Sequence, residues 1–216
     1  TCIEWVILAM VLSVLSGCAG HGTVEPEPVV HEPPVTQGPT VAQLADGRKG
    51  FVITEVSQLD DAARKNFQNA VAMLNDGHNE QAVDLLEKVI EQSPGVTAPY
   101  INLAIAYRHI DNLEPAEAHL KTALGLVPGH PAACNEYGML YRKTGRFEQA
   151  RAMYEKVLDR FPEYYPVHRN LGILCDLYLD DLECALEHYE IYGRARPEDE
   201  KVQLWIADLR NRLKNR

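Results

Sequence analysis

The residues of this chain most able to do chemistry are its five cysteines and eight histidines. The histidines form no H-E-x-x-H motif and no cluster with cysteines, so the sequence predicts no zinc site, and no other pattern predicts a bound cofactor. Cys134, Cys175 and Cys184 contain no C-x-x-C pair. Two interpretations stay open. These thiols could be inert core side chains, or Cys175 and Cys184 could form a disulfide across a helical hairpin in an oxidising compartment.

Catalysis is the function class that the sequence argues against most strongly. No Ser/His/Asp order, Gly-rich phosphate loop or metal cluster is present, so the chain is predicted not to be an enzyme and to have no small-molecule substrate. The net charge is −10 and the calculated pI is about 5.3. A nucleic-acid binder has to offset phosphate charge, so this acidic balance argues against nucleic acid as a partner.

A different kind of chemistry is suggested at Cys18, where an apolar run ends. From Trp5 to Gly20 there is no charged residue. These sixteen residues, at about 1.5 Å each, would make a helix of roughly 24 Å, which is shorter than the ~30 Å hydrocarbon core of a bilayer. The length favours a cleaved signal peptide at 1–17 over an uncleaved inner-membrane anchor, which is the alternative. The opening Thr-Cys-Ile-Glu departs from the usual basic start of a signal and suggests a truncated or misassigned beginning.

The stretch Leu15-Ser16-Gly17-Cys18 resembles the bacterial lipobox. The resemblance implies that the thiol of Cys18 is acylated and that Cys18 becomes the first residue of the mature protein. Several acyl chains would hold the protein on a membrane, which a single chain does not do. Ala19 after the cysteine favours, by the same resemblance, the outer membrane. We therefore expect a lipid-anchored protein of the cell envelope that faces the periplasm.

Residues 18–56 are predicted to be the lipidated cysteine followed by a flexible linker. Five prolines fall among glutamates, valines and glycines between residues 26 and 39. Such a composition cannot bury enough apolar surface to fold and tends toward extended polyproline II. Within the same range, Gly50 to Glu55 is predicted to be a short extended lead-in, and Ser57 with Asp60 an approximate capping box for the first helix.

A repeat dominates the rest of the chain. Pro94, Pro128, Pro162 and Pro197 are separated by 34, 34 and 35 residues, a period that indicates a solenoid. Aligning the sequence on these prolines gives four units: 63–96, 97–130, 131–164 and 165–199. Small residues recur in register because two packed helices need room where their backbones come closest. They are Ala70, Ala104, Gly138 and Gly172 in the first helices, and Ala82, Ala116, Ala150 and Ala185 in the second helices.

This pattern resembles the tetratricopeptide repeat, most closely in "NEYGMLYRKTGRFEQARAMYEKVLDRFP" at 135–162. The resemblance implies an all-α fold, an α-α superhelix of four helical hairpins over 57–200. Residues 201–216 are predicted to form a capping helix, because solenoids need a polar outer side at their ends. Its apolar residues recur at helical spacing at Val202, Trp205, Leu209 and Leu213.

The resemblance also implies a concave groove lined by certain positions of the first helices. In this sequence those positions combine basic and apolar side chains, which would suit an extended peptide with carboxylates and apolar groups. The alternative is that the charges are ordinary solvated ones. The predicted peptide-groove residues are Ile101, Ile105, Arg108, His109, Asn135, Met139, Arg142, Lys143, Arg169 and Ile173, with Asp176 beside them.

The last third, 170–213, resembles proteobacterial tetratricopeptide lipoproteins described as putative components of the TonB system. The likeness rests on Asn170-Leu171-Gly172-Ile173-Leu174, Ala185-Leu186-Glu187-His188-Tyr189 and Trp205-Ile206-Ala207-Asp208-Leu209. It implies a membrane-tethered periplasmic adaptor that binds a protein or peptide partner, within a TonB/ExbB/ExbD-type energy-transduction complex. The alternative is a pilotin-like assembly factor for a secretin or type IV pilus component, because such lipoproteins also use this repeat.

Overall fold

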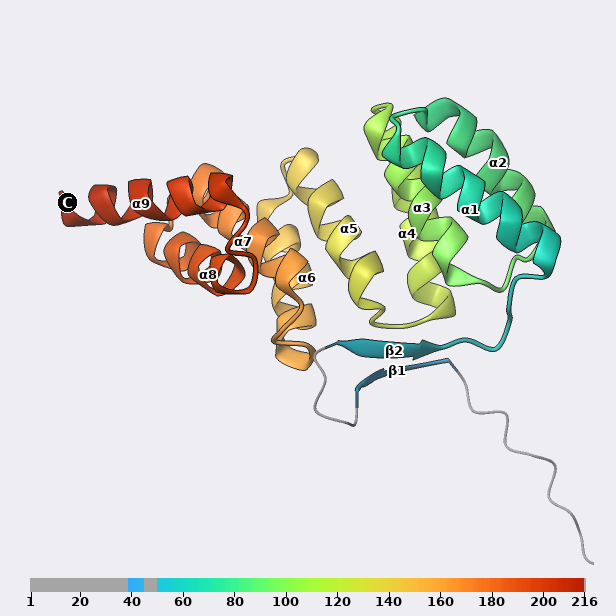
Figure 1. The fold of residues 1–216 in the computed structure, drawn as a ribbon, viewed down its shortest axis with the longest axis horizontal. Coiled ribbons are helices and arrows are strands. Elements are labelled where there is room, and N and C mark those ends of the chain that lie inside the picture. The colour runs from blue at the N-terminus through green and yellow to red at the C-terminus, as the bar shows by residue number, and fades with distance from the viewer. Residues whose placement is uncertain (1–38, 45–49, 216) are drawn as a thin grey trace, which may run out of the picture. The chain divides into compact units, whose positions relative to one another are not determined.

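The computed structural model describes residues 39–44 and 50–215, which form two short strands and nine helices (Figure 1). The predicted signal peptide 1–17, Cys18 and the linker as far as residue 38 lie outside the described residues. The strands are β1 (Thr40–Gln43) and β2 (Phe51–Thr54). The helices are α1 (Asp61–Asn75), α2 (Asn79–Gln92), α3 (Thr97–His109), α4 (Leu113–Leu126), α5 (Pro131–Lys143), α6 (Phe147–Arg160), α7 (Tyr165–Tyr178), α8 (Leu182–Ala195) and α9 (Glu200–Lys214).

Consecutive helices pair as hairpins: α1 with α2, α3 with α4, α5 with α6, and α7 with α8. Each second helix also packs on the first helix of the next hairpin, and α9 packs on α8. The prediction of an α-α solenoid of four hairpins and a C-terminal helix is therefore confirmed.

Glycines lie where the two helices of the later hairpins come closest. A Cβ atom built on Gly138 would lie 2.3 Å from Cε1 of Tyr154, and one built on Gly172 would lie 2.5 Å from Cδ1 of Tyr189. Both tyrosine rings are fully buried, so they have no free space to move into. The absence of a side chain at these two glycines is what allows the helices to approach around the rings.

The turns inside the four hairpins share one backbone feature. One residue in each turn has a positive φ: Gly77 (80°), Asp111 (63°), Gly145 (73°) and Asp180 (49°). Glycine adopts this left-handed conformation without steric cost, and aspartate tolerates it better than most residues. The four positions follow the spacing of the prolines, so the repeat sets the turn geometry as well as the helix packing.

The fourth hairpin has one extra residue before its turn. In the third hairpin the N–H of Arg146 donates to the carbonyl of Tyr141, five residues earlier, at 2.8 Å. In the fourth the N–H of Asp181 donates to the carbonyl of Cys175, six residues earlier, at 3.0 Å. The wider turn explains why the last period is 35 residues rather than 34.

A disulfide joins the two helices of this longer hairpin. Cys175 of α7 and Cys184 of α8 are bonded, with their Cα atoms 6.0 Å apart. This is the second of the two interpretations that the sequence left open. Cys134 is free and buried, and burial raises the pKa of its thiol. The bridge therefore closes the widest turn, and Cys134 packs as a small apolar residue.

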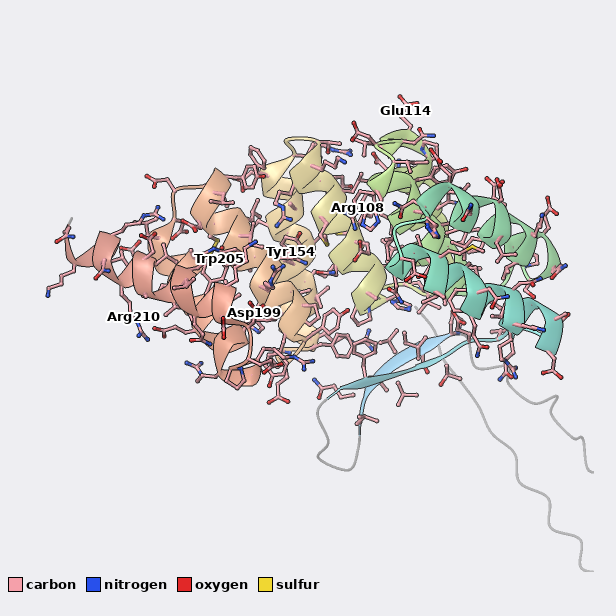
Figure 2. All side chains as sticks on the ribbon, turned by 45° about the horizontal axis from the view of Figure 1, so that its top comes forward. Arg108, Glu114, Tyr154, Asp199, Trp205 and Arg210 are labelled. Atoms are coloured by element: carbon pink, nitrogen blue, oxygen red, sulfur yellow. A yellow bond between two sulfur atoms is a disulfide. The ribbon has the colours of Figure 1, made fainter. Side chains whose placement is uncertain are left out.

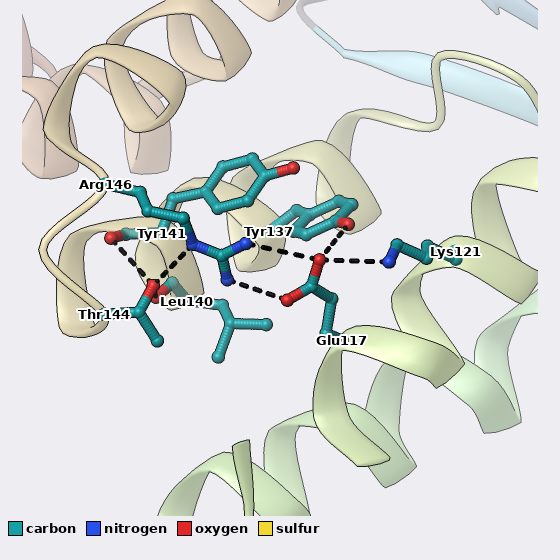
Figure 3. A network of polar contacts seen from close by, with 7 residues as sticks. All are labelled: Glu117, Lys121, Tyr137, Leu140, Tyr141, Thr144 and Arg146. Atoms are coloured by element: carbon teal, nitrogen blue, oxygen red, sulfur yellow. Dashed lines mark hydrogen bonds and ion pairs between the residues drawn. The ribbon is translucent and has the colours of Figure 1, made fainter. Parts of the chain in front are cut away.

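The second and third hairpins are tied together by Glu117 of α4 (Figure 3). Its carboxylate accepts two hydrogen bonds from Arg146, at 2.7 and 3.3 Å, and one from the hydroxyl of Tyr137 at 2.9 Å. Lys121 lies 3.1 Å away, and the Arg146 guanidinium stacks 4.4 Å from the centre of the Tyr141 ring. These contacts, led by the hydrogen bonds from Arg146, lower the pKa of Glu117 to about 2.

The two strands correct one prediction. β1 and β2 pair antiparallel, with Thr40 opposite Thr54 and Gln43 opposite Phe51. A flexible linker over 18–56 is therefore wrong for 40–43 and 51–54, although the short extended segment at 51–54 was expected. We call this pair the β-hairpin.

The β-hairpin is held by side chains far away in the sequence. The Phe51 ring packs against Phe161 and Tyr164, with centroids 5.5 and 5.3 Å apart. Val41 is buried in the same core as α6 and α7, and its carbonyl accepts a hydrogen bond from Arg160. Because these partners lie in and beside the loop between the third and fourth hairpins, the local sequence of 40–54 cannot reveal them.

The first and the last helix, α1 and α9, each have an aspartate as N-cap. Asp60 precedes α1 and accepts a hydrogen bond from the N–H of Ala63 at 2.7 Å. The predicted start of the first helix at Ser57 is thus wrong, because Asp60 is the N-cap and its side chain accepts from the N–H of Ala63. Asp199 caps α9 in the same way through Val202 at 3.2 Å, and α9 occupies most of the predicted capping segment 201–216.

Candidate protein-binding surface

The first helices of the hairpins form one continuous face. Within the described residues α1 contacts α3, α3 contacts α5, and α5 contacts α7, whereas the second helices do not contact one another. Helices on the inner side of a curved stack lie closer together than those on the outer side, so the concave side is made by the first helices. All the predicted groove residues lie on α3, α5 and α7.

Two of the predicted groove arginines bind the next hairpin. Arg108 of α3 pairs with Glu136 of α5 at 2.9 Å, and both side chains are only about 15% exposed. Arg142 of α5 donates to the backbone carbonyl of Asn170 on α7 at 3.3 Å. Both pairs are 28 residues apart, so in both cases position 12 of one unit binds position 6 of the next. These contacts tie each repeat to the next one, and the Arg108 guanidinium is already paired with a carboxylate.

Two asparagines extend the contacts of these arginines into a row of polar side chains across α3, α5 and α7, which we call the polar row. The side-chain amide of Asn170 donates to Asn135 Oδ1 at 2.8 Å, and Asn135 Nδ2 lies 3.3 Å from Glu136 Oε1. Both asparagines are only 6% exposed. Arg108, Glu136, Asn135 and Asn170 therefore form one chain of contacts across α3, α5 and α7, which fixes the spacing of the concave face.

Apolar side chains run beside the polar row. Ile105, Met139 and Ile173 occupy the same position in three successive units and are each half-buried. We call them the apolar row. Ile101, by contrast, is 6% exposed and belongs to a core cluster with Tyr100, so the structure does not bring it to the surface.

The remaining predicted groove residues lie at the edges of the face. Lys143 is exposed and reaches Asp111 at 2.7 Å and the carbonyl of Arg108 at 3.1 Å. His109 contacts Asn79 at 3.0 Å, and its pKa is lowered, first by partial burial and then by Arg108. Lys143 therefore supplies an exposed positive charge at this edge.

Arg169 lies at the far end of the face, above the ring of Trp205 at 5.5 Å and 3.9 Å from Asp199. Figure 2 shows Trp205 and Asp199 on neighbouring parts of the C-terminal array. Asp176, at the same place on α7 as Arg142 on α5, pairs with Arg212 of α9 at 2.7 Å. Of the basic lining expected from the sequence, Arg108 pairs with a carboxylate of the next repeat and Lys143 with one of the preceding turn, whereas Arg142 contacts a backbone carbonyl.

Sequence reasoning missed the partners Glu136, Asn170 and Asp199. A signal for two of them was present, because Glu136 and Asn170 each follow an arginine by 28 residues, in units of 34. In a stacked solenoid such a spacing joins the end of one first helix to the middle of the next.

One group of described side chains lies close enough together to suggest metal chemistry. The side chains grouped closely enough for a metal ion are Cys175, Asp181 and Cys184, of which the two cysteines are bonded to each other. Asp181 is occupied by the N–H of Cys184 at 3.1 Å and by Arg151 at 2.9 Å, and these bonds lower its pKa. Within the same residues no helix is long and apolar enough to cross a membrane.

Comparison with known proteins agrees with the geometry. A family model described as tetratricopeptide repeat matches residues 73–125 and 111–171. The solved structure of pilF from Pseudomonas aeruginosa superposes with a TM-score of 0.65 at 25% identity, covering 72% of this chain and 71% of that one. The fold is a tetratricopeptide-repeat superhelix.

Two further comparisons show how widely the likeness extends. CDC16, an anaphase-promoting complex subunit of Saccharomyces cerevisiae, is 26% identical over 108 residues, which are 50% of this chain and 13% of CDC16. This chain thus spans only a small part of the curated relative. The first tetratricopeptide domain of Spaghetti (RPAP3), solved with the HSP90 peptide SRMEEVD, has a TM-score of 0.50 at 21% identity and covers 55% of this chain and 94% of that one.

Proposed function

We propose that this protein is an envelope-tethered adaptor that binds a protein partner along the apolar row. The observation that carries the proposal is the row itself: three half-buried apolar side chains on three helices that are joined by the contacts of Arg108 with Glu136 and of Asn170 with Asn135. A pre-formed surface of this kind loses little conformational entropy when a partner binds. The partner would lay apolar side chains over Ile105, Met139 and Ile173 and meet Lys143 at the edge.

The repeats are a protein-interaction scaffold, and a solved relative of the same fold holds a peptide. For this chain the proposal differs from a charge clamp, because Arg108 and Arg142 are engaged by neighbouring repeats. We therefore expect shape and apolar contact to contribute more affinity than ion pairs.

The location and the complex are part of the same proposal. The lipobox-like Leu15–Cys18 stretch supports lipid anchoring in the envelope, with the outer membrane and the periplasm as the site of action. The resemblance of 170–213 to lipoproteins described with the TonB system supports a role in a TonB-type energy-transduction complex.

A second candidate is an assembly factor for a secretin or type IV pilus component. The structural likeness to Pseudomonas aeruginosa pilF, over about seven tenths of each chain, is the observation that favours it. Both candidates use the same surface, so identification of the partner separates them.

The test is crosslinking capture in intact cells with the full chain, followed by mass spectrometry. Met139→Lys places a charge in the middle of the apolar row and should reduce capture about tenfold or more without changing the helical content. Leu204→Lys is the matched control, because Leu204 is 70% exposed on α9 and lies away from the row.

An energy-transduction component among the captured proteins supports the first candidate, and a secretin or pilus component supports the second. Capture that is unchanged in Met139→Lys would show that the apolar row is not the binding surface.

A further inference from the structure

A second surface lies where the β-hairpin meets the last two hairpins. A cleft of about 880 Å³ opens between β2, the start of α7, and the segment that joins α8 to α9. Four half-buried aromatic rings line it: Phe51, Tyr164, Tyr165 and Tyr192. Pro166 adds a fifth ring. We call this the tyrosine cleft.

The rings of the tyrosine cleft are fixed by contacts behind them. Phe51 meets Tyr164 edge to face at 5.3 Å, and the Tyr192 hydroxyl donates to Asp199 at 3.1 Å. Tyr165 packs near the ring of His168 at 6.5 Å. Rigid tyrosines supply large contact areas at a low entropy cost, and each ring combines an apolar face with a polar tip.

This lining suits a particular kind of peptide. Proline-rich segments adopt the extended polyproline II helix before they bind, and they dock in grooves lined by aromatic rings. The proline rings stack between the aromatic side chains, and the free backbone carbonyls of the segment need donors. In the tyrosine cleft such a donor is the guanidinium of Arg196, which is 59% exposed and lies 3.8 Å from the Glu198 carboxylate through one of its nitrogens.

Charge then selects among proline-rich segments. Glu163, Glu198 and Asp199 line the tyrosine cleft, against Arg169 and Arg196. Arg169 lies 3.9 Å from Asp199 and Arg196 lies 3.8 Å from Glu198, so the lining as a whole carries an excess of one negative charge, in a chain of net charge −10. A basic segment is attracted and an acidic one repelled, and this preference acts on both association rate and specificity.

We propose that the tyrosine cleft binds a proline-rich segment that carries lysine or arginine, supplied by the partner protein. This inference rests on the proposed function, since it names a class of partner for the same adaptor. The chain has a proline-rich segment of its own at 24–39, but that segment contains three glutamates and no lysine or arginine. Charge therefore disfavours it as the occupant.

The test uses three labelled 16-residue peptides and the full chain, with binding followed by fluorescence anisotropy. The first peptide has the sequence of residues 24–39. The second is the same with Glu25→Lys, Glu27→Lys and Glu32→Lys, and the third is the second with its five prolines changed to alanine. We expect the second peptide to bind about tenfold or more tightly than either of the others.

Variants of the chain locate the site. Tyr165→Ala should weaken the second peptide about tenfold, and Tyr165→Phe, which keeps the ring, should not. Glu198→Lys should weaken it several-fold through charge. Glu155→Lys on α6, 57% exposed and away from the cleft, is the matched control and should change nothing.

Equal binding of the second and third peptides would overturn the proposal, since charge alone would then explain it. Tighter binding of the acidic peptide would also overturn it, in favour of the chain's own segment. So would a Tyr165→Ala variant that binds normally. These failures leave the apolar row untouched, because Met139→Lys tests that surface in a separate assay.

Discussion

The first two hairpins and the last two solve the same packing problem with different residue pairs. In the first two, Ala70 and Ala104 share their core clusters with Leu86 and Leu120. In the last two, the equivalent positions hold a glycine and a tyrosine, Gly138 with Tyr154 and Gly172 with Tyr189. The smaller residue on the first helix, glycine in place of alanine, is compensated by a larger one on the second helix, tyrosine in place of leucine.

This difference shows that a helical repeat can keep the total volume of two facing side chains while the volume of each one varies. The glycine and tyrosine pair depends on a close contact in which no Cβ atom would fit on the first helix. The later hairpins should therefore be less tolerant of substitution at the small position.

The largest expected effect is at Gly138. Gly138→Ala forces a methyl group against the buried Tyr154 ring and should lower the free energy of unfolding by about 2–3 kcal/mol, measured by urea denaturation. Ala104→Gly, the reverse change in the second hairpin, should cost only about 1 kcal/mol, because it adds backbone freedom and a small gap.

The double variant Gly138→Ala with Tyr154→Leu installs the second-hairpin pair in the third hairpin. It should be more stable than Gly138→Ala alone by more than about 1 kcal/mol. If the double variant is the less stable of the two, the two pairs are not interchangeable and the comparison breaks down.

A second contrast concerns the proline carbonyls. In the second unit the hydroxyl of Tyr100 donates to the carbonyl of Pro94 at 3.0 Å. In the fourth unit His168 takes that place, with Nε2 2.8 Å from the carbonyl of Pro162 and Nδ1 3.0 Å from Nδ1 of His188. If Nε2–H donates to the carbonyl, as the Tyr100 hydroxyl does, then Nδ1 of His168 accepts from Nδ1–H of His188, and the His168 ring is neutral.

This arrangement makes the fourth unit sensitive to acid. Burial, and then the neighbouring His168, lower the pKa of His188 to about 4 from 6.5. Between these values the unfolded chain binds a proton that the folded chain does not, so stability is greatest above about pH 6.5 and falls as the pH drops toward 4. At pH 5 the expected loss is about 1–2 kcal/mol relative to pH 7.

The measurement is urea denaturation at pH 7 and pH 5. His188→Met, which installs the residue found at this position in the third unit (Met153), should remove most of this loss. His78→Gln, at an exposed helix start, is the control and should keep the full loss. An unchanged pH dependence in His188→Met would place the acid sensitivity elsewhere.

The smallest effect is expected in the turns inside the hairpins, where the residue with positive φ is glycine in the first and third hairpins and aspartate in the second and fourth. Gly145 has φ of 73° and open space where a Cβ atom would lie, so Gly145→Ala should cost about 1 kcal/mol from backbone strain alone. Gly145→Asp should cost about half as much, because aspartate occupies the same turn position at Asp111. Thermal unfolding would show the order, and equal costs for alanine and aspartate would contradict it.

Much of the fold could be predicted because its signals are local and repeated. Pro94, Pro128 and Pro162 set the period, and the small residues mark where helices cross. The β-hairpin could not be predicted, since its strands have four residues each and its stabilising partners, such as Phe161, lie more than a hundred residues away.

The candidate surface was predicted only in outline. The helices that carry it were expected, but Arg108 and Arg142 were interpreted as open charges because their partners belong to the next repeat. An alignment of the repeats shows which residues are equivalent, but it does not show which residues of one repeat contact the next. Only pairing each unit with its neighbour, at a distance of 28 residues, would have shown them.

The β-hairpin also sets how the array would respond to a pull. Thr40 and Thr54 are opposite each other, so a force applied through the chain before Thr40 and resisted by α1 acts on adjacent ends of the two strands. Under such a load the hydrogen bonds between β1 and β2 break one after another from the Thr40–Thr54 end rather than all at once. The strands would peel away before any helix is stretched, releasing slack that shields the repeats from the first increment of tension.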